Sequence, residues 1–426
     1  MRRNVFEAVV GYEDIKLELS RILDQVVSPE KYAALGVEQP HGVLLHGAPG
    51  VGKSTIAKCF MDACGRRTFV CRKDKPDGEF VNEIVRVFDQ AAEAAPSVIL
   101  LDDMDKFANE DENRRDAEEF VTVQACIDRV KDKPVLVIAT VNNFRKLPES
   151  LTRAGRFDHV LRISRPEGKD AQAVVAHYLA RKPYVANMDM KRIGRLLEGR
   201  SCAELEGVVN QAGAYAAFDG RDRVEMKDMI KAILRIVFDA PEKSNASEKS
   251  LPLIACHEAA HALIAELLEP DSVDLVTILS HDSDAAGVTS LYRDENYFHS
   301  KRLMEIRVMC LLAGKAATEL CFGAVDTGTI SDLRRAFAIV QRFVDDYCSF
   351  GFDKFVFTET VSNDLLSRRD TQVASEMDRY YAQVRQILVE NRGKLDMLTA
   401  RLLDKKILLG DEVQEILHGH AQKMAA

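Results

Sequence analysis

A glycine-rich run, Gly47-Ala-Pro-Gly-Val-Gly-Lys-Ser54, limits the possible folds of this chain more than any other feature of its sequence. An apolar stretch that begins at Gly42 precedes it, and a helical pattern follows it from Ser54 to Cys64. In the spacing G-x-x-x-x-G-K-[ST], glycines let backbone N–H groups surround phosphate, and the start of the helix adds positive potential. We therefore expect a nucleotide-binding loop between a strand and a helix. The alternative is a glycine-rich turn with an incidental lysine.

Two further apolar runs, Ser97 to Leu101 and Val135 to Thr140, are rich in Val, Ile and Leu. Such runs are typical of strands that are buried on both faces of a parallel sheet. Helical patterns, for example Glu83 to Ala94, lie between them. This alternation predicts an α/β fold with a parallel sheet for the first part of the chain.

Carboxylates end one of the predicted strands, in Val98-Ile-Leu-Leu-Asp-Asp-Met-Asp105. We expect Asp102 to hold magnesium and Asp103 to polarise the attacking water. Lys53 is expected to reach the β- and γ-phosphates, and the Ser54 hydroxyl to ligate magnesium. The alternative for the carboxylates is a solvated acidic turn.

Three polar residues further along can complete the same site. Asn142 follows the third apolar run, where it can position water near the γ-phosphate, although an isolated Asn is also a common turn residue. Arg153 and Arg156 can act as fingers on the nucleotide of a neighbouring subunit. For the arginines taken alone, a solvated charged turn is the alternative.

The remaining sequence divides the chain into parts by its pattern. We expect an α/β nucleotide-binding subdomain at 1–166, a helical lid at 167–238, a polar linker at 239–251 and a mainly helical domain at 252–426. The linker contains Pro and several Ser residues among charged ones, which is typical of a domain boundary. One β-like stretch, from Ser272 to Arg293, interrupts the last helical part.

A second motif, His257-Glu-Ala-Ala-His261, lies inside an apolar helical stretch of this last part. Residues four apart share one face of a helix, so both imidazoles can bind one zinc ion. Glu258 beside them can take a proton from the attacking water. The alternative is a pair of histidines that is exposed or buried without a metal.

A catalytic zinc usually has three protein ligands and an open position, so a third ligand must come from elsewhere. Asp332, in Thr327-Gly-Thr-Ile-Ser-Asp-Leu333, is a candidate at the start of an amphipathic helix. From spacing alone, the interpretation of Ser331 or Asp332 as a simple helix N-cap is favoured.

Composition excludes several classes of protein. The 58 Lys and Arg residues and 67 Asp and Glu residues give a net charge of −9, and there is no Trp, so nucleic acid is not an expected partner. No apolar run approaches the ~18 residues of a membrane span. The N-terminus lacks the apolar core of a signal peptide. Nine cysteines without C-x-x-C spacing are expected to be reduced thiols in a cytoplasmic protein.

The two motifs, in this order on one chain, resemble the FtsH-type AAA+ zinc metalloproteases. The resemblance begins with Val5-Phe-Glu-Ala-Val-Val-Gly-Tyr-Glu-Asp-Ile-Lys16 and ends near Leu417. It includes Gly155-Arg-Phe-Asp158, Gly199-Arg-Ser-Cys-Ala-Glu-Leu205 and Leu312-Ala-Gly-Lys-Ala-Ala-Thr-Glu-Leu320.

The resemblance implies an α/β AAA+ core with an α-helical lid, followed by a mainly α-helical zinc metallopeptidase domain, in a homo-hexameric ring that acts on polypeptides. It implies zinc, ATP and magnesium as cofactors. It assigns metal binding to His257, His261 and Asp332, and substrate binding by strand addition to Ala286-Gly-Val-Thr-Ser-Leu291. The implied nucleotide-binding residues are Gly47, Pro49, Gly50, Gly52, Lys53, Ser54, Thr55 and Asp102, and the implied catalytic residues are Glu258, Asp103, Asn142 as the first sensor, and Arg153 and Arg156 as arginine fingers.

Four departures from the family's pattern stand out. Asp103 replaces the usual Glu, so water polarisation is expected to be weaker. The segment that should grip substrate is about four residues shorter, and Phe80 is either its aromatic residue or a packing residue at a helix start. The zinc motif has Ala-Ala where Ala-Gly is usual. The usual N-terminal membrane anchor is absent, so membrane association is expected only if an anchor was removed.

Three hypotheses follow from these observations. The first is an ATP-dependent zinc endopeptidase that threads unfolded chain through a ring to its zinc sites. The second is a nucleotide-gated peptidase assembly with a slow or inactive ATPase that cuts only unstructured polypeptides. The third is a remodelling ATPase with a silent protease, against which the intact zinc motif argues.

Overall fold

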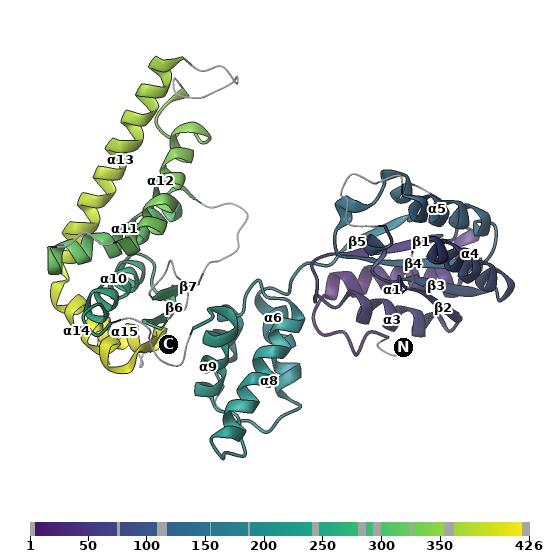
Figure 1. Cartoon of the computed structure of the whole chain (residues 1–426), viewed down its shortest axis with the longest axis horizontal. Helices are drawn as coiled ribbons and strands as arrows, with labels where there is room; N and C mark the ends of the chain where they lie inside the picture. Colours follow the sequence, from purple (N-terminus) through teal and green to yellow (C-terminus); the bar gives the residue numbers. More distant parts are fainter. Residues whose placement is uncertain are drawn as a thin grey trace. The chain divides into compact units, whose positions relative to one another are not determined.

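The structure, a computed structural model, describes residues 5–74, 77–108, 117–153, 155–185, 188–240, 247–279, 287–292, 300–323, 327–352 and 362–419 (Figure 1). Contacts divide the chain into two compact units, Met1–Met229 and Ile230–Ala426. The predicted finer division at residues 166, 238 and 251 stays a prediction.

The first unit is built on a five-stranded parallel sheet with the strand order β2-β3-β4-β1-β5. The strands are β1 (Gly42–His46), β2 (Arg67–Cys71), β3 (Ser97–Leu101), β4 (Val135–Val141) and β5 (His159–Arg162). Every residue of β3 and β4 is buried, as their apolar sequences predict. Because β3, β4 and β1 are neighbours and parallel, their carboxyl ends lie at one edge of the sheet.

Helices cover both faces of this sheet (Figure 1). Alternate residues of each strand point to opposite faces, so Leu44 packs with one helix layer and Val43 and Leu45 with the other. The helices are α1 (Glu13–Val27), α2 (Pro29–Ala33), α3 (Lys53–Cys64), α4 (Asp77–Glu93) and α5 (Glu118–Val130). The predicted α/β core with a parallel sheet is confirmed.

The segment after the sheet is helical, as predicted. Its helices are α6 (Gly168–Leu179), α7 (Met190–Leu196), α8 (Cys202–Phe218) and α9 (Met226–Val237). In α8 a capping box between Ser201 and Glu204 fixes the first turn. The Ala203 amide at this end donates to the Gly50 carbonyl at 3.1 Å, so the start of α8 contacts the glycine-rich loop.

The second unit is mainly helical, as predicted. It contains α10 (Leu251–Leu268), α11 (Lys301–Phe322), α12 (Ile330–Asp345), α13 (Asn363–Glu390), α14 (Arg392–Lys405) and α15 (Gly410–His418). A small antiparallel sheet has the order β7-β6-β8, with β6 (Val273–Thr277), β7 (Val288–Leu291) and β8 (Ile407–Leu409). The predicted β-like stretch therefore supplies β6 and β7, whereas β8 has no clear signal in the sequence.

The helix α10 forms the centre of this unit, and its residues 254–266 are all buried. It packs against α11 and α14, since its sequence is apolar on nearly all sides. By length and composition alone it could cross a membrane, but 67% of it is buried inside the protein, as expected for a core helix.

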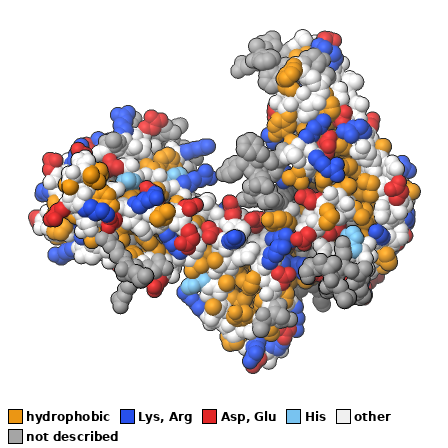
Figure 2. Space-filling view, turned by 180° about the vertical axis from the view of Figure 1, so that it is seen from behind, with side chains coloured by type: hydrophobic (Ala, Val, Ile, Leu, Met, Phe, Trp, Pro, Cys, Tyr) orange, Lys and Arg blue, Asp and Glu red, His pale blue; other side chains and the backbone are white. Residues whose placement is uncertain are grey.

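Charged side chains of both signs are interspersed over the face seen in Figure 2, with apolar side chains between them. This mixture agrees with the similar numbers of basic and acidic residues, 58 and 67.

Candidate active sites

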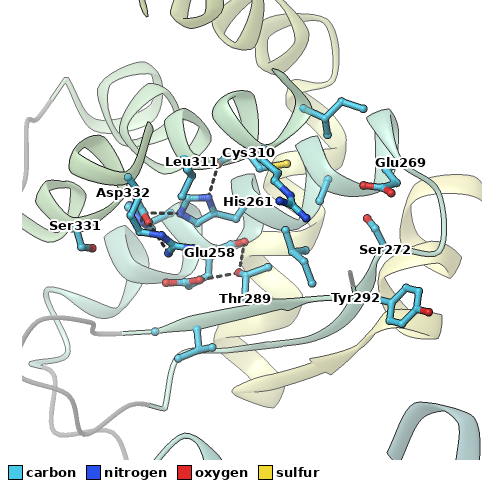
Figure 3. Close-up of a pocket in the computed structure, with 18 of the residues that line it drawn as sticks. Glu258, His261, Glu269, Ser272, Thr289, Tyr292, Cys310, Leu311, Ser331 and Asp332 are labelled. Atoms are coloured by element: carbon cyan, nitrogen blue, oxygen red, sulfur yellow. Dashed lines mark hydrogen bonds and ion pairs between the residues drawn. The ribbon is translucent and has the colours of Figure 1, made fainter. Parts of the chain in front are cut away.

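Two histidines of α10 and one aspartate of α12 converge in the second unit (Figure 3). The Nε2 atoms of His257 and His261 lie 3.4 and 3.2 Å from Oδ2 of Asp332. All three possible ligand atoms lie within 4.8 Å of one another. The histidines are each 8% exposed, so their rings are held by the surrounding core rather than free in solvent.

The alternative that Ser331 or Asp332 caps a helix does not hold in the structure. The helix α12 begins at Ile330, with Thr329 at the N-cap position and no side-chain cap. Asp332 therefore lies inside the first turn, on the side that faces the histidines.

The electrostatics of this cluster favour a charged Asp332. Burial would raise the pKa of the Asp332 carboxyl, but hydrogen bonds and charge from His257 and His261 lower it strongly overall. Burial would lower the pKa of His261, but Asp332 outweighs it and raises the pKa of this imidazole. The raised pKa favours a second proton on the His261 ring. A metal ion would have to displace this second proton, because histidine binds metal in its neutral form.

Neighbouring groups orient the two imidazoles. The Nδ1 atom of His261 lies 2.6 Å from the carbonyl oxygen of Cys310, which assigns the proton to Nδ1 and leaves Nε2 as the free ligand atom. Gly314 of α11 lies directly against His257: a Cβ atom at Gly314 would be 2.3 Å from Cε1 of that ring. Glycine at 314 is therefore required by the close approach of α10 and α11, and this role was not predicted from the sequence.

Glu258 faces the same pocket from the position next to His257 (Figure 3). The Thr289 hydroxyl of β7 donates to Oε2 of Glu258 at 2.7 Å. This bond holds one carboxylate oxygen and leaves the other for a proton. The strand β7 is the edge of its sheet, where strand addition of a peptide was predicted; Ala286 of that prediction lies outside the described residues.

The glycine-rich loop connects β1 to α3 in the first unit, as predicted, and its residues Gly47, Pro49, Gly50, Gly52, Lys53, Ser54 and Thr55 lie between β1 and the first turn of α3. Gly52 has a φ of +95°, which L side chains rarely adopt. The ammonium of Lys53 donates to the carbonyls of Gly47 and Ala48 at 2.9 and 2.8 Å and to Oδ1 of Asn142 at 2.7 Å. Burial lowers the pKa of Lys53, and nearby aspartates partly offset this effect.

Asp102 lies beside the loop, at the carboxyl end of β3. Its Oδ1 accepts hydrogen bonds from the hydroxyls of Ser54 at 3.2 Å and Thr140 at 2.7 Å. The guanidinium of Arg72, which follows β2, lies 3.3 Å from Oδ2. The pairing of Ser54 with Asp102 brings together the two groups predicted to hold magnesium.

Asp103 and Asn142 also meet at this edge of the sheet. Asn142 donates to Oδ1 of Asp103 at 3.0 Å, and Lys106 lies 2.7 Å from Oδ2. Burial would raise the pKa of Asp103, but Lys106 and Asn142 lower it overall, so this carboxylate is ionised at neutral pH.

Sequence reasoning missed several groups that hold this site. Asp105 accepts hydrogen bonds from the backbone amides of Asn142 and Asn143 at 3.0 and 3.1 Å and so fixes the turn after β4. Thr140 and Arg72 hold Asp102. In the sequence, Asp105 and Thr140 are polar residues directly beside the predicted motifs. The structure adds that both are buried, which indicates a positioning role.

A small pocket beside the loop was also missed. Its lining includes Val9, Tyr12, Val51, Thr55, Val174 and Cys202. The hydroxyl of Tyr12 donates to the carbonyls of Val51 and Ser164 at 3.3 and 3.1 Å. This mixture of apolar walls and a fixed ring next to a phosphate loop suits a nucleotide base.

The two arginines differ in their surroundings. Arg156 forms an ion pair with Asp128 at 2.8 Å and donates to the Ser150 carbonyl at 2.7 Å. Arg153 is exposed. Within the described part of this chain, neither arginine contacts Lys53, Asp102 or Asn142. Action on the nucleotide of another subunit would require such an arrangement.

The alternative in which Phe80 grips substrate is wrong for this structure. Phe80 lies in α4, is 0% exposed and packs edge-to-face against Phe107, with ring centroids 4.8 Å apart. It is a core residue, because α4 turns its apolar side toward the sheet.

Comparisons with known proteins agree with both sites. Residues 43–165 match the ATPase family associated with various cellular activities (AAA), and residues 244–416 match peptidase family M41. The fold and sites thus define an AAA ATPase joined to a metallopeptidase.

Relatives match nearly the whole chain. The ATP-dependent zinc metalloprotease FtsH of Thermobaculum terrenum is 30% identical, over 97% of this chain and 69% of that protein. FtsH of Bacillus subtilis is 28% identical, over 98% and 70%, and FtsH 1 of Thermomicrobium roseum is 29% identical, over 96% and 68%. The chain belongs to the FtsH family of ATP-dependent zinc metalloproteases, which confirms the predicted resemblance.

Membership of this family implies zinc, and ATP with magnesium, as cofactors. The residues present fit both. Two imidazole nitrogens and a carboxylate oxygen are a usual donor set for catalytic zinc, and their separations of 3.2 and 3.4 Å suit ligands about 2 Å from one ion. The glycine-rich loop, with Ser54 and Asp102 in contact, is a usual cradle for a nucleotide and magnesium.

Proposed function

We propose that this protein is an ATP-dependent zinc endopeptidase that unfolds and degrades proteins as a homo-hexamer. The single observation that best supports it is the convergence of His257, His261 and Asp332 beside Glu258. This cluster lies in a pocket of about 380 Å³ next to the edge strand β7. On the same chain, Lys53, Asp102 and Asn142 form the ATPase site.

In the peptidase step, His257, His261 and Asp332 hold the metal, which when bound supplies the Lewis acid that activates water and polarises the scissile carbonyl. Glu258 takes a proton from the attacking water at the carboxylate oxygen that Thr289 leaves free. It then delivers that proton to the leaving amine. Cys310 keeps His261 in the tautomer whose Nε2 faces the metal.

In the ATPase step, Lys53 exchanges its bonds to the loop carbonyls for the phosphates of the nucleotide. Ser54 and Asp102 would hold magnesium, which would neutralise negative charge on the phosphates, while ATP supplies the transferable phosphoryl group. Asn142 holds Asp103 in place, and Asp103 orients the water in line with the γ-phosphate. Arg153 of one subunit completes the site of the next.

The proposed location is the cytoplasm. All nine cysteines are free thiols, as expected for a reducing compartment. Membrane association is proposed only for a form of the protein that carries an anchor.

The test uses a stably folded, tagged protein and a short unstructured peptide as substrates. The proposal expects that ATP is required for degradation of the folded protein, and that Lys53→Ala removes this activity while peptide cleavage persists. Glu258→Gln should lower both activities by about 10²–10⁴-fold with zinc retained. Folded-protein degradation without nucleotide, or full peptide cleavage by zinc-loaded Glu258→Gln, would contradict the proposal.

A further inference from the structure

The pocket at the metal cluster extends well beyond the candidate ligands. It follows one face of α10 from His257 and His261 past Ala265 to Glu269. The opposite walls are formed by β7 and by α11. About two turns of α10 separate Glu269 from His261, a rise of roughly 12 Å. A side chain next to the scissile bond would therefore need a long stem to reach the far end.

The stem of that side chain would pass through an apolar section. Ala265 is small and leaves the passage open, and Leu291, Leu303 and Ile306 line it. Methylene groups lose no hydrogen bond when they are buried there. This section therefore accepts an aliphatic chain without regard to what the chain carries at its tip.

The far end of the pocket is polar. Glu269 and Ser272 lie there next to one another, away from the metal cluster (Figure 3). Ser272 is 4% exposed, and its Oγ has no hydrogen-bond partner within the described part of the chain. A buried hydroxyl without a partner is unusual in a native structure, and a ligand group at this end would supply that partner.

Glu269 places a negatively charged side chain at this end. Cys310 also lines the pocket, and burial and then the charge of Glu269 raise the pKa of its thiol to about 12. Arg307 lines the pocket from α11, but it makes no ion pair with any described residue and has no comparable effect on Cys310. Glu269 likewise forms no ion pair among the described residues, so its carboxylate is available to a cation.

We propose that this pocket selects a lysine or arginine next to the scissile bond, whose aliphatic stem fills the apolar section and whose cation binds Glu269 and Ser272. Lys and Arg alone combine a long apolar stem with a cationic tip. Glu269 and Ser272 are thus specificity-determining residues. The inference rests on the proposed peptidase activity of the same site.

The first experiment digests an unbiased peptide mixture with the full-length protein and maps the cleavage positions by mass spectrometry. The expected cuts cluster beside Lys and Arg. Matched peptides with Lys, norleucine or Glu at the selected position should then differ in kcat/KM, with Lys favoured over norleucine by about 10-fold or more. Norleucine keeps most of the stem and lacks the charge.

Three variants test the roles of Glu269 and Ser272. The measured quantity is the ratio of kcat/KM for the Lys peptide to kcat/KM for the norleucine peptide, because this ratio is insensitive to partial loss of folded protein. Glu269→Gln should bring the ratio close to one, and Glu269→Lys should favour the Glu peptide. Ser272→Ala should lower the ratio less than Glu269→Gln. The control Glu248→Gln alters an exposed acid outside the pocket and should leave the ratio unchanged.

The possible failures are distinguishable. Zinc-dependent cleavage without a preference for basic residues, or a preference that survives Glu269→Gln, would overturn the inference and leave the peptidase proposal intact. A preference of the unaltered protein for acidic peptides would indicate that Arg307, and not Glu269, selects the substrate side chain. This result would also overturn the inference. Absence of any zinc-dependent cleavage would instead refute the proposed function.

Discussion

Asp103 has a left-handed backbone conformation, with a φ of 53°, a region that Asp tolerates better than most residues. Its carboxylate is held on one side by Asn142 and on the other by Lys106. The side chain is one methylene shorter than glutamate, so in the proposed role its carboxylate would lie roughly 1.5 Å further from the γ-phosphate. A displacement of that size can lower a reaction rate by ~10².

We therefore predict that Asp103→Glu accelerates ATP hydrolysis and the degradation of folded substrates, with little change in ATP affinity or in cleavage of short peptides. Lys53, Ser54 and Asp102, which we propose to bind the nucleotide and its magnesium, remain unaltered. Steady-state ATPase assays and nucleotide titrations measure both effects. Slower hydrolysis by Asp103→Glu would mean that the site is adapted to the shorter acid.

A second prediction at this scale concerns Asp332. Removing this carboxylate in Asp332→Ala leaves two imidazoles as the only proposed ligands, so the bound zinc per subunit should fall. Metal analysis after gel filtration gives the result. Ser331→Ala, which alters the neighbouring exposed residue, should retain full zinc. Unchanged zinc in Asp332→Ala would place the third ligand elsewhere.

At the scale of elements, the close contact of α10 with α11 depends on Gly314. A methyl group at that position would lie 2.3 Å from the His257 ring, so Gly314→Ala should push this ring from its position. We predict weaker zinc binding and a loss of peptide cleavage. The matched control is Gly393→Ala in α14, where a Cβ would meet nothing within 4 Å.

Ala stabilises a helix relative to Gly by ~0.5–1 kcal/mol. Gly393→Ala should therefore retain its zinc, and its unfolding temperature should be unchanged or slightly higher. Zinc titration and thermal unfolding of both variants distinguish a local clash from a general effect of alanine. Normal zinc affinity in Gly314→Ala would show that the two helices can separate at no cost.

The sequence predicts the elements that lie within one continuous motif and fails where distant segments meet. The glycine-rich loop and the His257–His261 pair are short motifs with fixed spacing, so their local structure follows from the chain itself. The assignment of Asp332 as a metal ligand depended on the family resemblance, because spacing alone does not distinguish a metal ligand from a helix cap. Phe80 was ambiguous since an aromatic residue near a helix start has the same pattern whether it is buried or exposed.

At the scale of the whole molecule, neither predicted arginine finger contacts Asn142 within the part of the chain that the structure describes. Arg153 is exposed, whereas Arg156 is bound to Asp128 and Ser150. We predict that ATP turnover per subunit falls when the protein is diluted until its oligomers dissociate. Sedimentation and ATPase rate over the same concentration range measure this.

Variants of the two arginines refine that prediction. Arg153→Ala should lower turnover without a change in unfolding temperature, whereas Arg156→Ala should also lower the unfolding temperature, because it removes contacts within the chain. A constant rate from a demonstrated monomer would contradict action between subunits.

The proposed zinc ligands also have an order in time. His257, Glu258 and His261 leave the ribosome together on α10, but Asp332 lies on α12, two helices later. Until α12 has been synthesised and has packed beside α10, a growing chain carries the proton acceptor without a complete metal site. With Asp332 as the proposed third ligand, we expect the peptidase to be inactive during its own synthesis, and we expect a chain that ends before α12 to be unable to digest its neighbours.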